Sequence, residues 1–486
     1  MTGRAIMLQG TGSDVGKSLL VAGLCRIARR RGVDVAPFKP QNMSNNAAAC
    51  PGGGEIGRAQ ALQARAAGLE PSTDMNPVLL KPESDRRAQV VLNGKALRSE
   101  EAAAYMASRG SLLPTVIDAF YRLKMAHDLV IVEGAGSPAE VNLRKGDIAN
   151  MGFARAADVP VVLVGDIDRG GVIASLVGTR AVIETDDAEM IAGFVINRFR
   201  GDQALFEDGV RFIEDRTGWR SFGIVPWLPC AARLPAEDAV VLGQAKPKHG
   251  AILIAVPMLS RISNFDDLDP LRAEPDVEVR FIPPGQPFPR DSDAVILAGT
   301  KSTLADIAVL RSEGWDHDII AAWRTGARIV GLCGGFQMLG NRIEDADAAD
   351  GLAGSADGLG LFDMRTAMTR KKVVRPISGT TIADHDAVTG YEIHTGLSQG
   401  PALENPFSRL EDGAFDGAVA AGGRLIGTYL HGVFASDGFR SRWLERLRSG
   451  RNSTLDYEDS VEIALDELAD GIEAALDVDA LLALAR

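Results

Sequence analysis

The chain has 486 residues, which is too long for one hydrophobic core, so two domains and a terminal appendage are expected. Its 52 basic and 65 acidic residues leave a net charge of −13, which argues against nucleic acid as a partner. No apolar run approaches the roughly 18 residues of a membrane span, and no signal-peptide pattern is present, so a cytoplasmic protein without membrane contact is expected. The four cysteines are scattered without CxxC spacing, which argues against a zinc site or a disulfide framework.

The first chemical motif is the glycine-rich stretch GTGSDVGKS, residues 10–18, between an apolar run and a helical pattern. Glycines let backbone N–H groups converge on phosphate oxygens, lysine neutralises phosphate charge, and a serine hydroxyl can bind Mg²⁺. The motif departs from the strict spacing, because Thr11 stands where a glycine is usual. We expect an ATP site here. Its predicted contacts are Gly10, Thr11, Gly12, Gly16, Lys17, Ser18 and Asn197.

Polar and acidic residues follow several predicted strands, where ligands bind in open α/β sheets. Glu133 ends the apolar run 129–132 and is expected to make the second Mg²⁺ contact. Glu55 is a further candidate for the metal site, or a plain acid at a helix N-terminus. The polar run 41–46 and the strand exit 165–171 offer side chains to a substrate, although such loops are often plain turns. The substrate-binding candidates are Lys39, Gln41, Asn42, Asn45, Asp166 and Asp168.

Strands alternate with helical stretches over residues 1–228, which predicts a doubly wound, mostly parallel α/β sheet. Residues 229–249 lose this periodicity and gather prolines and charges, so they are expected to form a linker. A second α/β series occupies residues 250–440. The Ala/Leu/Asp/Glu pattern of residues 441–486 predicts a helical appendage of unassigned role.

The second chemical motif is a G-x-C-x-G turn centred on Cys333, between a predicted strand and a helix. Small neighbours permit a strained turn that exposes the thiol, and the helix N-terminus favours its thiolate form. His431 is the expected base and His394 the runner-up. The N–H of Gly334 and a donor at Gly299, in the loop 299–300, would form an oxyanion hole. A buried structural cysteine is the alternative.

These motifs together resemble the glutamine-dependent cobyric acid synthases of the cobalamin pathway, over residues 4–434. The stretches that carry the resemblance are GTGSDVGKS (10–18), PFKPQNMSNN (37–46), GGEIGRAQALQA (53–64), EGAGSPAEVNLR (133–144), GDIDRGG (165–171), GLCGGFQMLG (331–340), GYEIHTG (390–396) and GTYLHGVF (427–434). The resemblance implies a P-loop first domain similar to dethiobiotin synthetases and a second, class I glutamine amidotransferase-like α/β domain.

The resemblance also implies the chemistry. Ammonia released from glutamine would amidate side chains b, d, e and g of adenosylcobyrinic acid a,c-diamide, through an acyl phosphate formed with ATP and Mg²⁺. The partners are then a corrinoid and glutamine, and whether the chain forms a homo-oligomer stays open.

Class I glutaminases ordinarily carry a glutamate two residues after the histidine, and Val433 stands there in this chain. A Cys–His dyad is therefore expected, and what orients His431 is left unanswered. Two other functions stay open. One is the earlier a,c-diamide synthase, against which the stretch 37–46 argues. The other is a ParA-like ATPase switch, which would lack a glutaminase domain.

Overall fold

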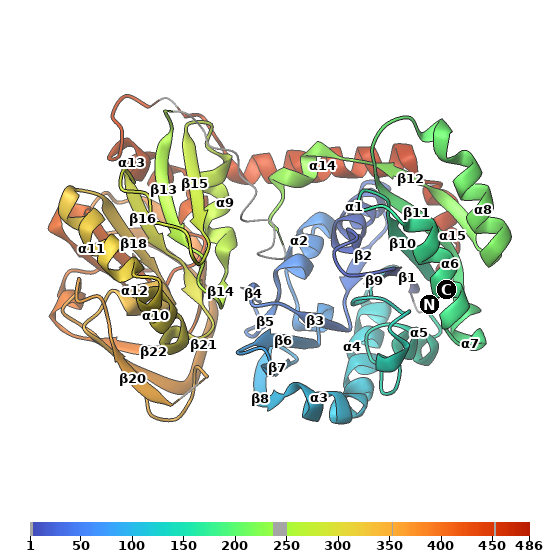
Figure 1. Ribbon diagram of the computed structural model, residues 1–486, viewed down its shortest axis with the longest axis horizontal. Helices are drawn as coiled ribbons and strands as arrows, with labels where there is room; N and C mark the ends of the chain where they lie inside the picture. The colour runs from blue at the N-terminus through green and yellow to red at the C-terminus, as the bar shows by residue number, and fades with distance from the viewer. Residues whose placement is uncertain (1–2, 237–249, 352, 452) are drawn as a thin grey trace.

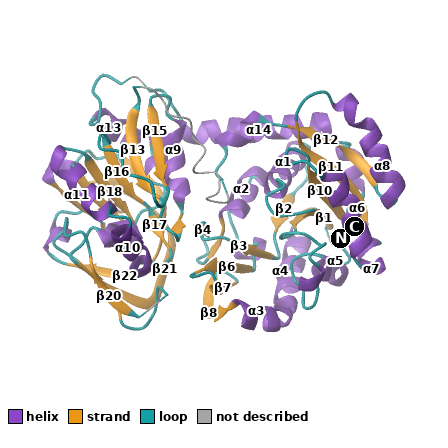
Figure 2. Cartoon of the chain, viewed as in Figure 1, coloured by secondary structure: helices purple, strands orange, loops and turns teal. Residues whose placement is uncertain are grey.

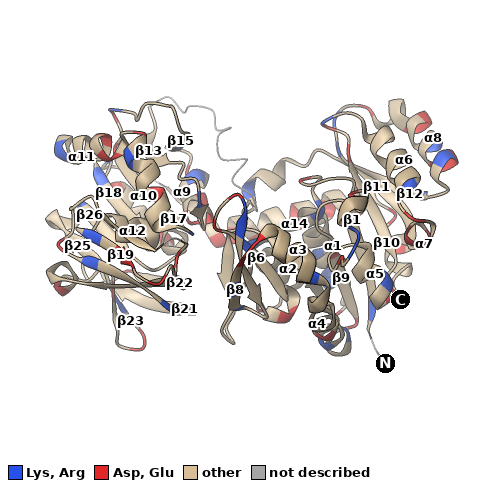
Figure 3. Cartoon of the chain, turned by 60° about the horizontal axis from the view of Figure 1, so that its bottom comes forward, with Lys and Arg blue, Asp and Glu red and all other residues tan. Residues whose placement is uncertain are grey.

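The computed structural model describes every residue except 1–2, 237–249, 352 and 452, and it consists of two lobes side by side (Figure 1). Helices and strands alternate in both lobes (Figure 2). Acidic and basic residues are interspersed over the two lobes in the view of Figure 3. In the part of the chain that is described, no helix is both long and apolar enough to cross a membrane.

The N-terminal lobe is built on a six-stranded parallel sheet with the order β12-β11-β10-β1-β9-β2. Its strands are β1 (Arg4–Gly10), β2 (Val35–Phe38), β9 (Leu129–Glu133), β10 (Val161–Asp166), β11 (Ile191–Phe199) and β12 (Arg220–Pro226). The main helices around it are α1 (Lys17–Arg30), α2 (Arg58–Ala67), α4 (Leu113–Ala126), α5 (Met151–Ala157), α6 (Val172–Val182) and α8 (Glu207–Thr217). The predicted doubly wound sheet is confirmed.

Alternate residues of β1 pack into two separate cores, one on each face of this sheet. Ala5 and Met7 join the core that includes Phe120 of α4, whereas Ile6 and Leu8 join the core that includes Leu24 of α1. Both faces are covered, so the central strands are continuously apolar, as expected for a buried parallel sheet. The carboxyl ends of these strands deliver the loop 10–18 and Glu133 to one edge.

A smaller sheet of order β3-β6-β7-β8 lies between the main sheet and the second lobe (Figure 1). It consists of β3 (Gln41–Met43), β6 (Val78–Pro82), β7 (Arg87–Leu92) and β8 (Lys95–Glu101), and a hairpin of β4 (Ala47–Ala49) and β5 (Glu55–Gly57) lies beside it. Part of the polar run 41–46, for which a turn was one interpretation, is therefore a strand. Its register with β6 pairs Gln41 with Val78.

The C-terminal lobe contains a six-stranded sheet of order β15-β13-β16-β18-β26-β25, parallel except for β25. Its strands are β13 (Ile252–Pro257), β15 (Val277–Ile282), β16 (Ala294–Leu297), β18 (Arg328–Leu332), β25 (Ala418–Ala420) and β26 (Leu425–Thr428). The helices of this lobe include α9 (Asp269–Ala273), α10 (Thr303–Ser312), α11 (Trp315–Thr325), α12 (Gly334–Met338) and α13 (Asp437–Glu445). The α/β class predicted for this half is confirmed.

A second sheet of this lobe, which the sequence did not predict, is dominated by a long antiparallel hairpin. Its arms are β21 (Arg365–Thr381) and β22 (Ala387–Gln399). The strands β19 (Arg342–Asp345), β20 (Gly354–Asp357), β23 (Ser408–Leu410) and β24 (Phe415–Asp416) complete it. A two-stranded pair, β14 (Ile262–Ser263) with β17 (Gly299–Thr300), lies beside the main sheet.

The C-terminal segment returns to the N-terminal lobe as α14 (Tyr457–Ala475) and α15 (Val478–Ala483). Helix α14 packs against α1, and Gly23 permits the close approach, because a Cβ there would overlap the Ile472 side chain. An ion pair between Arg26 and Asp466, at 2.8 Å, fixes the register. The predicted appendage, residues 441–486, is therefore divided: Trp443 and Leu444 of α13 pack in the C-terminal lobe, whereas α14 and α15 pack on the first lobe. Of the predicted linker, residues 229–233 form a 3₁₀ turn, and residues 237–249 lie outside the described residues.

Candidate active sites

Cys333 occupies a strained turn between β18 and α12. Its backbone has φ 51° and ψ −109°, which a residue with a side chain adopts only at an energetic cost. The turn needs small neighbours: a Cβ on Gly335 would overlap the Leu297 carbonyl oxygen, and one on Gly331 would lie 2.7 Å from the next turn of backbone. The Cys333 thiol donates to the Ile393 carbonyl at 3.3 Å. This geometry is that of a nucleophile elbow.

His431 follows β26 and is buried against a carboxylate. Its Nδ1 lies 2.7 Å from Oδ2 of Asp267, whose other oxygen accepts the Gly432 N–H at 2.6 Å. Burial opposes the charged imidazole, but the charges of Asp267 and Cys333 and hydrogen bonds with both raise the pKa of His431 to about 10. Cys333, His431 and Asp267 therefore form a Cys–His–carboxylate arrangement. The dyad expected from Val433 is wrong in this respect.

Sequence reasoning missed Asp267 because it lies 164 residues before His431, in the 3₁₀ turn Phe265–Leu268. The only signal was a pair of adjacent acids, Asp266 and Asp267, and nothing in the sequence distinguishes them. In the structure their roles differ: Asp266 forms an ion pair with Arg58 of the N-terminal lobe at 2.9 Å.

Asn264, a residue of the C-terminal lobe, connects His431 with the N-terminal lobe by hydrogen bonds. The Asn264 side-chain Nδ2 lies 3.3 Å from Nε2 of His431. The Asn264 backbone N–H donates to Oδ1 of Asn46 at 2.7 Å, and its own Oδ1 accepts the Ala47 N–H at 3.0 Å. The end of the polar run 41–46 thus holds the segment that orients the histidine.

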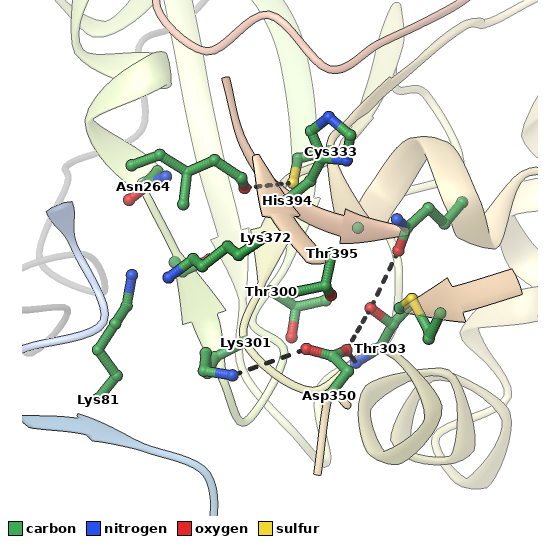
Figure 4. A pocket seen from close by; sticks show the side chains of 15 residues that line it. Lys81, Asn264, Thr300, Lys301, Thr303, Cys333, Asp350, Lys372, His394 and Thr395 are labelled. Atoms are coloured by element: carbon green, nitrogen blue, oxygen red, sulfur yellow. Dashed lines mark hydrogen bonds and ion pairs between the residues drawn. The ribbon is translucent and has the colours of Figure 1, made fainter. Parts of the chain in front are cut away.

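His394, the runner-up base, has a different environment. Its ring stacks on Tyr429 with centroids 4.0 Å apart, and its Nδ1 contacts the Gly396 carbonyl at 3.0 Å. Burial is the main cause that lowers the pKa of His394. It lines the pocket at Cys333 (Figure 4) without the carboxylate that accompanies His431.

The loop 299–300 lies against the turn at Cys333, where the oxyanion hole is predicted. The Thr300 nitrogen lies 3.2 Å from the position that a Cβ on Gly334 would take, so the two turns adjoin. Gly299 pairs with Ser263 of β14. Within the loop 299–300, Thr300 is therefore the donor nearer to Gly334, rather than the Gly299 that the sequence favoured.

The loop 10–18 wraps the start of α1. Gly16 has φ 91°, and a Cβ there would overlap the Asn197 side-chain amide. That amide donates to the Val15 carbonyl oxygen at 2.8 Å. Lys17 lies over the loop, with Nζ 3.0 Å from the Gly12 carbonyl oxygen. A Cβ on Gly10 would lie 2.8 Å from that Nζ. Thr11, at the irregular position, donates its N–H to Val164 at 2.9 Å.

Glu133 is the centre of a buried polar cluster at the end of β9. Its Oε1 accepts from the Ser18 hydroxyl at 2.8 Å and from the Lys39 ammonium at 2.8 Å. Its Oε2 accepts from Gln63 at 2.6 Å and from Gln60 at 3.4 Å. The structure thus brings together three of the predicted site residues, Ser18, Lys39 and Glu133.

Ser18 and Glu133 suit a magnesium ion. Adjacent ligands of an octahedral Mg²⁺ with bonds of about 2.1 Å lie about 3.0 Å apart, and the two oxygens here are 2.8 Å apart. Within the described ranges, no group of three or more histidines, cysteines, aspartates or glutamates could hold a metal. Phosphate oxygens and water would therefore supply the remaining ligands, as is usual for Mg²⁺.

Glu55, the further metal candidate, does not fit that role. Its fully buried carboxylate accepts from Lys81 at 2.9 Å and from Lys372 of the other lobe. Burial opposes the charge, but these two lysines lower the pKa of Glu55 to about 2. The prediction of a metal ligand is wrong because β5 directs this carboxylate to the junction of the lobes, where two cations hold it.

The other substrate-binding candidates divide into two groups. Near the Glu133 cluster, Asn42 donates to Gln60 at 2.8 Å, and Gln41 accepts from Tyr105 at 2.6 Å. Among the residues that the structure describes, Oδ1 of Asn45 is buried without a hydrogen-bond partner. At the ends of β10 and β11, two ion pairs form: Asp166 with Arg198 at 3.0 Å, and Asp168 with Arg200 at 2.6 Å.

Comparison with known proteins gives the same division of the chain. Residues 6–241 match a family model described as the CobQ/CobB/MinD/ParA nucleotide binding domain, and residues 253–439 match the CobB/CobQ-like glutamine amidotransferase domain. The chain is 63% identical to a cobyric acid synthase of Hyphomonas neptunium, over 100% of this chain and 98% of that protein. It is 61% identical to the cobyric acid synthase of Paracoccus denitrificans, over 99% of this chain and 100% of that protein.

Proposed function

The chain belongs to the cobyric acid synthase family, as its motifs predicted, and we propose that it catalyses the ATP- and glutamine-dependent amidation of a corrinoid. The observation that carries this proposal is the presence in one chain of the Cys333–His431–Asp267 arrangement and of a phosphate loop whose Ser18 meets Glu133. The substrate is proposed to be adenosylcobyrinic acid a,c-diamide, amidated at side chains b, d, e and g.

In the C-terminal lobe, Cys333 attacks the side-chain amide carbonyl of glutamine. His431 takes up the thiol proton and delivers it to the departing nitrogen, so that ammonia leaves and a thioester remains. Asp267 holds the imidazole in the required orientation and stabilises its charged form. The N–H groups of Gly334 and Thr300 would receive the oxyanion, and water then hydrolyses the thioester to glutamate.

In the N-terminal lobe, a corrinoid carboxylate attacks the γ-phosphate of ATP, which releases ADP and forms an acyl phosphate. Ammonia then attacks the acyl carbon and displaces inorganic phosphate, so that the amide forms. Lys17 and the glycines of the loop 10–18 bind phosphate oxygens. Ser18 and Glu133 would hold Mg²⁺, which neutralises phosphate charge when bound. The Asn197 amide holds the loop by donating to the Val15 carbonyl oxygen. Lys39, Asn42 and Asn45 are proposed to bind the corrinoid.

Product analysis tests the proposal. The purified chain is incubated with ATP, Mg²⁺, glutamine and each candidate corrinoid, and the products are measured by mass spectrometry. Each amidation replaces a hydroxyl by an amino group and lowers the mass by about one unit, so four successive steps are expected from the a,c-diamide. Amidation of cobyrinic acid at positions a and c instead would identify the earlier diamide synthase.

A further inference from the structure

Glutamine needs two binding functions in the pocket at Cys333: one at the reacting amide and one at its α-amino acid end. The pocket is lined by both lobes. Its polar lining includes Lys301, Lys372 and Asp350 from the C-terminal lobe and Lys81 from β6 of the N-terminal lobe. In Figure 4 the lysines lie toward the left and lower left of the pocket, while the Cys333 sulfur lies toward the upper right.

The charges of these lysines are unequally compensated. Lys301 has two carboxylates nearby, Glu83 at 3.6 Å and Asp350 at 3.8 Å. Among the described residues, Lys81 and Lys372 instead pair with one and the same carboxylate, that of Glu55.

All three members of this Lys81–Glu55–Lys372 cluster are largely withdrawn from water, with side-chain exposures of 4%, 0% and 15%. A buried excess of positive charge is costly, and an additional anion would lower that cost. Burial, reinforced by the neighbouring Lys81 and Lys301, lowers the pKa of Lys372 to about 8 despite the opposing charge of Glu55. The cluster therefore has the electrostatic character of a carboxylate site.

We infer that Lys372 and Lys81 bind the α-carboxylate of glutamine, so that the glutamine pocket is completed by a residue of the N-terminal lobe. The inference rests on the proposed glutaminase reaction at Cys333 and adds to it the groups that recognise the substrate's distal end. The two ammonium groups already flank one carboxylate, that of Glu55, and charge-assisted hydrogen bonds of the same kind would hold the carboxylate of glutamine. Because Lys81 lies on β6, which pairs with β3 of the polar run 41–46, glutamine recognition is structurally continuous with the first lobe.

Two glutamine analogues separate a binding role from a structural one. Glutaramate keeps the carboxylate of glutamine but lacks the α-amino group, and γ-aminobutyramide keeps the amino group but lacks the carboxylate. For Lys372→Met, and separately for Lys81→Met, we expect the KM for glutamine and the inhibition constant of glutaramate to rise about 10- to 100-fold. The inhibition constant of γ-aminobutyramide should change less than about twofold. Lys372→Arg, which keeps the charge, should recover part of the loss.

Arg261→Met is the matched control. Arg261 forms an ion pair across the lobes with Asp85, at 2.7 Å, and does not line the pocket. This variant weakens the contact between the lobes without removing a cation from the pocket, so its KM for glutamine should match that of the unaltered chain. Ammonium-dependent synthesis, measured in parallel, reports that the N-terminal lobe of each variant is folded.

Two results would overturn the inference. One is a KM for glutamine within about twofold of the unaltered value in both lysine variants. The other is an equal weakening of glutaramate and γ-aminobutyramide, which would make the Lys81–Glu55–Lys372 cluster a structural clamp only. Failure of the unaltered chain to release glutamate from glutamine would refute the proposed function itself, and is distinguishable from both.

Discussion

The two candidate active sites differ in the partners of their charged groups. In the C-terminal lobe, the protein itself supplies a complete chain of groups, from Asp267 through His431 to Cys333, and each has a defined partner. In the N-terminal lobe, Glu133 accepts hydrogen bonds from four side chains, and Lys17 contacts backbone carbonyls. Glutamine hydrolysis therefore uses groups of the chain alone. Phosphoryl transfer would also need a nucleotide and a metal ion, which would replace some of the protein contacts that Lys17 and Glu133 make here.

The sharpest separation of the two sites is removal of the nucleophile. Cys333→Ala should abolish glutamine-dependent synthesis, while ammonium salts should still support synthesis, because the N-terminal lobe needs only ammonia. The measurement is product formation with each nitrogen source at saturating ATP. Equal loss with both sources, in a variant that circular dichroism shows to be folded, would contradict the division of labour.

Next in size is the loss of proton transfer. His431→Ala and Asp267→Asn should each lower the rate of glutamine hydrolysis by about 10²- to 10⁴-fold, and His394→Ala should do less. Asp267 raises the pKa of His431, so the imidazole should lose its proton at a lower pH in Asp267→Asn. Because the charged imidazole delivers the proton to the departing nitrogen, the alkaline limb of the pH–rate profile should then move to lower pH. Asp266→Asn is the matched control, because the Asp266 carboxylate is adjacent in sequence but pairs with Arg58 instead of His431. A larger loss with His394→Ala would show that the base is misassigned.

The sequence predicted those parts of the two sites whose geometry is local. Cys333 was recognisable because a strand, small residues and a helix follow one another within ten positions, and Glu133 because an apolar strand ends on it. Asp267 could not be found this way, since its contact with His431 arises from tertiary packing of a 3₁₀ turn. Glu55 was misinterpreted for the same reason. Its neighbours in sequence indicate a helix start, whereas its partners Lys81 and Lys372 come from elsewhere in the chain.

The fold shows a similar limit. Buried parallel strands are continuous apolar runs, so the two main sheets could be predicted from the sequence. The hairpin β21–β22 carries polar residues at many positions, and the buried residues of its first arm, such as Met368 and Ile377, are few and widely spaced. The sheet containing β3 and β6 was missed because a three-residue strand of Gln, Asn and Met has no hydrophobic pattern.

A smaller effect, on the Mg²⁺ requirement, would test whether Ser18 and Glu133 bind the same metal ion. Ser18→Ala and Glu133→Gln should each raise the Mg²⁺ concentration needed for acyl-phosphate formation by at least about 10-fold, and the two losses should be non-additive when combined. Lys17→Ala should instead raise the KM for ATP and lower kcat, because the lost charge serves both the bound nucleotide and the transition state. The experiment titrates Mg²⁺ and ATP separately for each variant.

Glutamine hydrolysis in these three variants provides the internal control, since the C-terminal site uses none of the altered groups. It should stay close to the unaltered rate. Unchanged Mg²⁺ dependence in both Ser18→Ala and Glu133→Gln would remove this pair from the metal site.

The smallest predicted effect concerns pH and the junction of the lobes. Lys372 faces Glu55, Lys81 and Lys301, and burial is the main cause that lowers its pKa to about 8. Binding of a carboxylate needs the protonated amine, so the KM for glutamine should rise as the pH increases through about 8, by up to about 10-fold one unit above it. Glu55, with its pKa lowered to about 2, stays charged throughout this range.

The ionisation of His431 affects every amide substrate alike. The ratio of the glutamine KM to the inhibition constant of γ-aminobutyramide, compared between the unaltered chain and Lys372→Met, therefore isolates the lysine. That ratio should rise with pH in the unaltered chain and lose this step in Lys372→Met. A step of the same size in the variant would assign the titration to another group and leave Lys372 without a role in recognising the carboxylate.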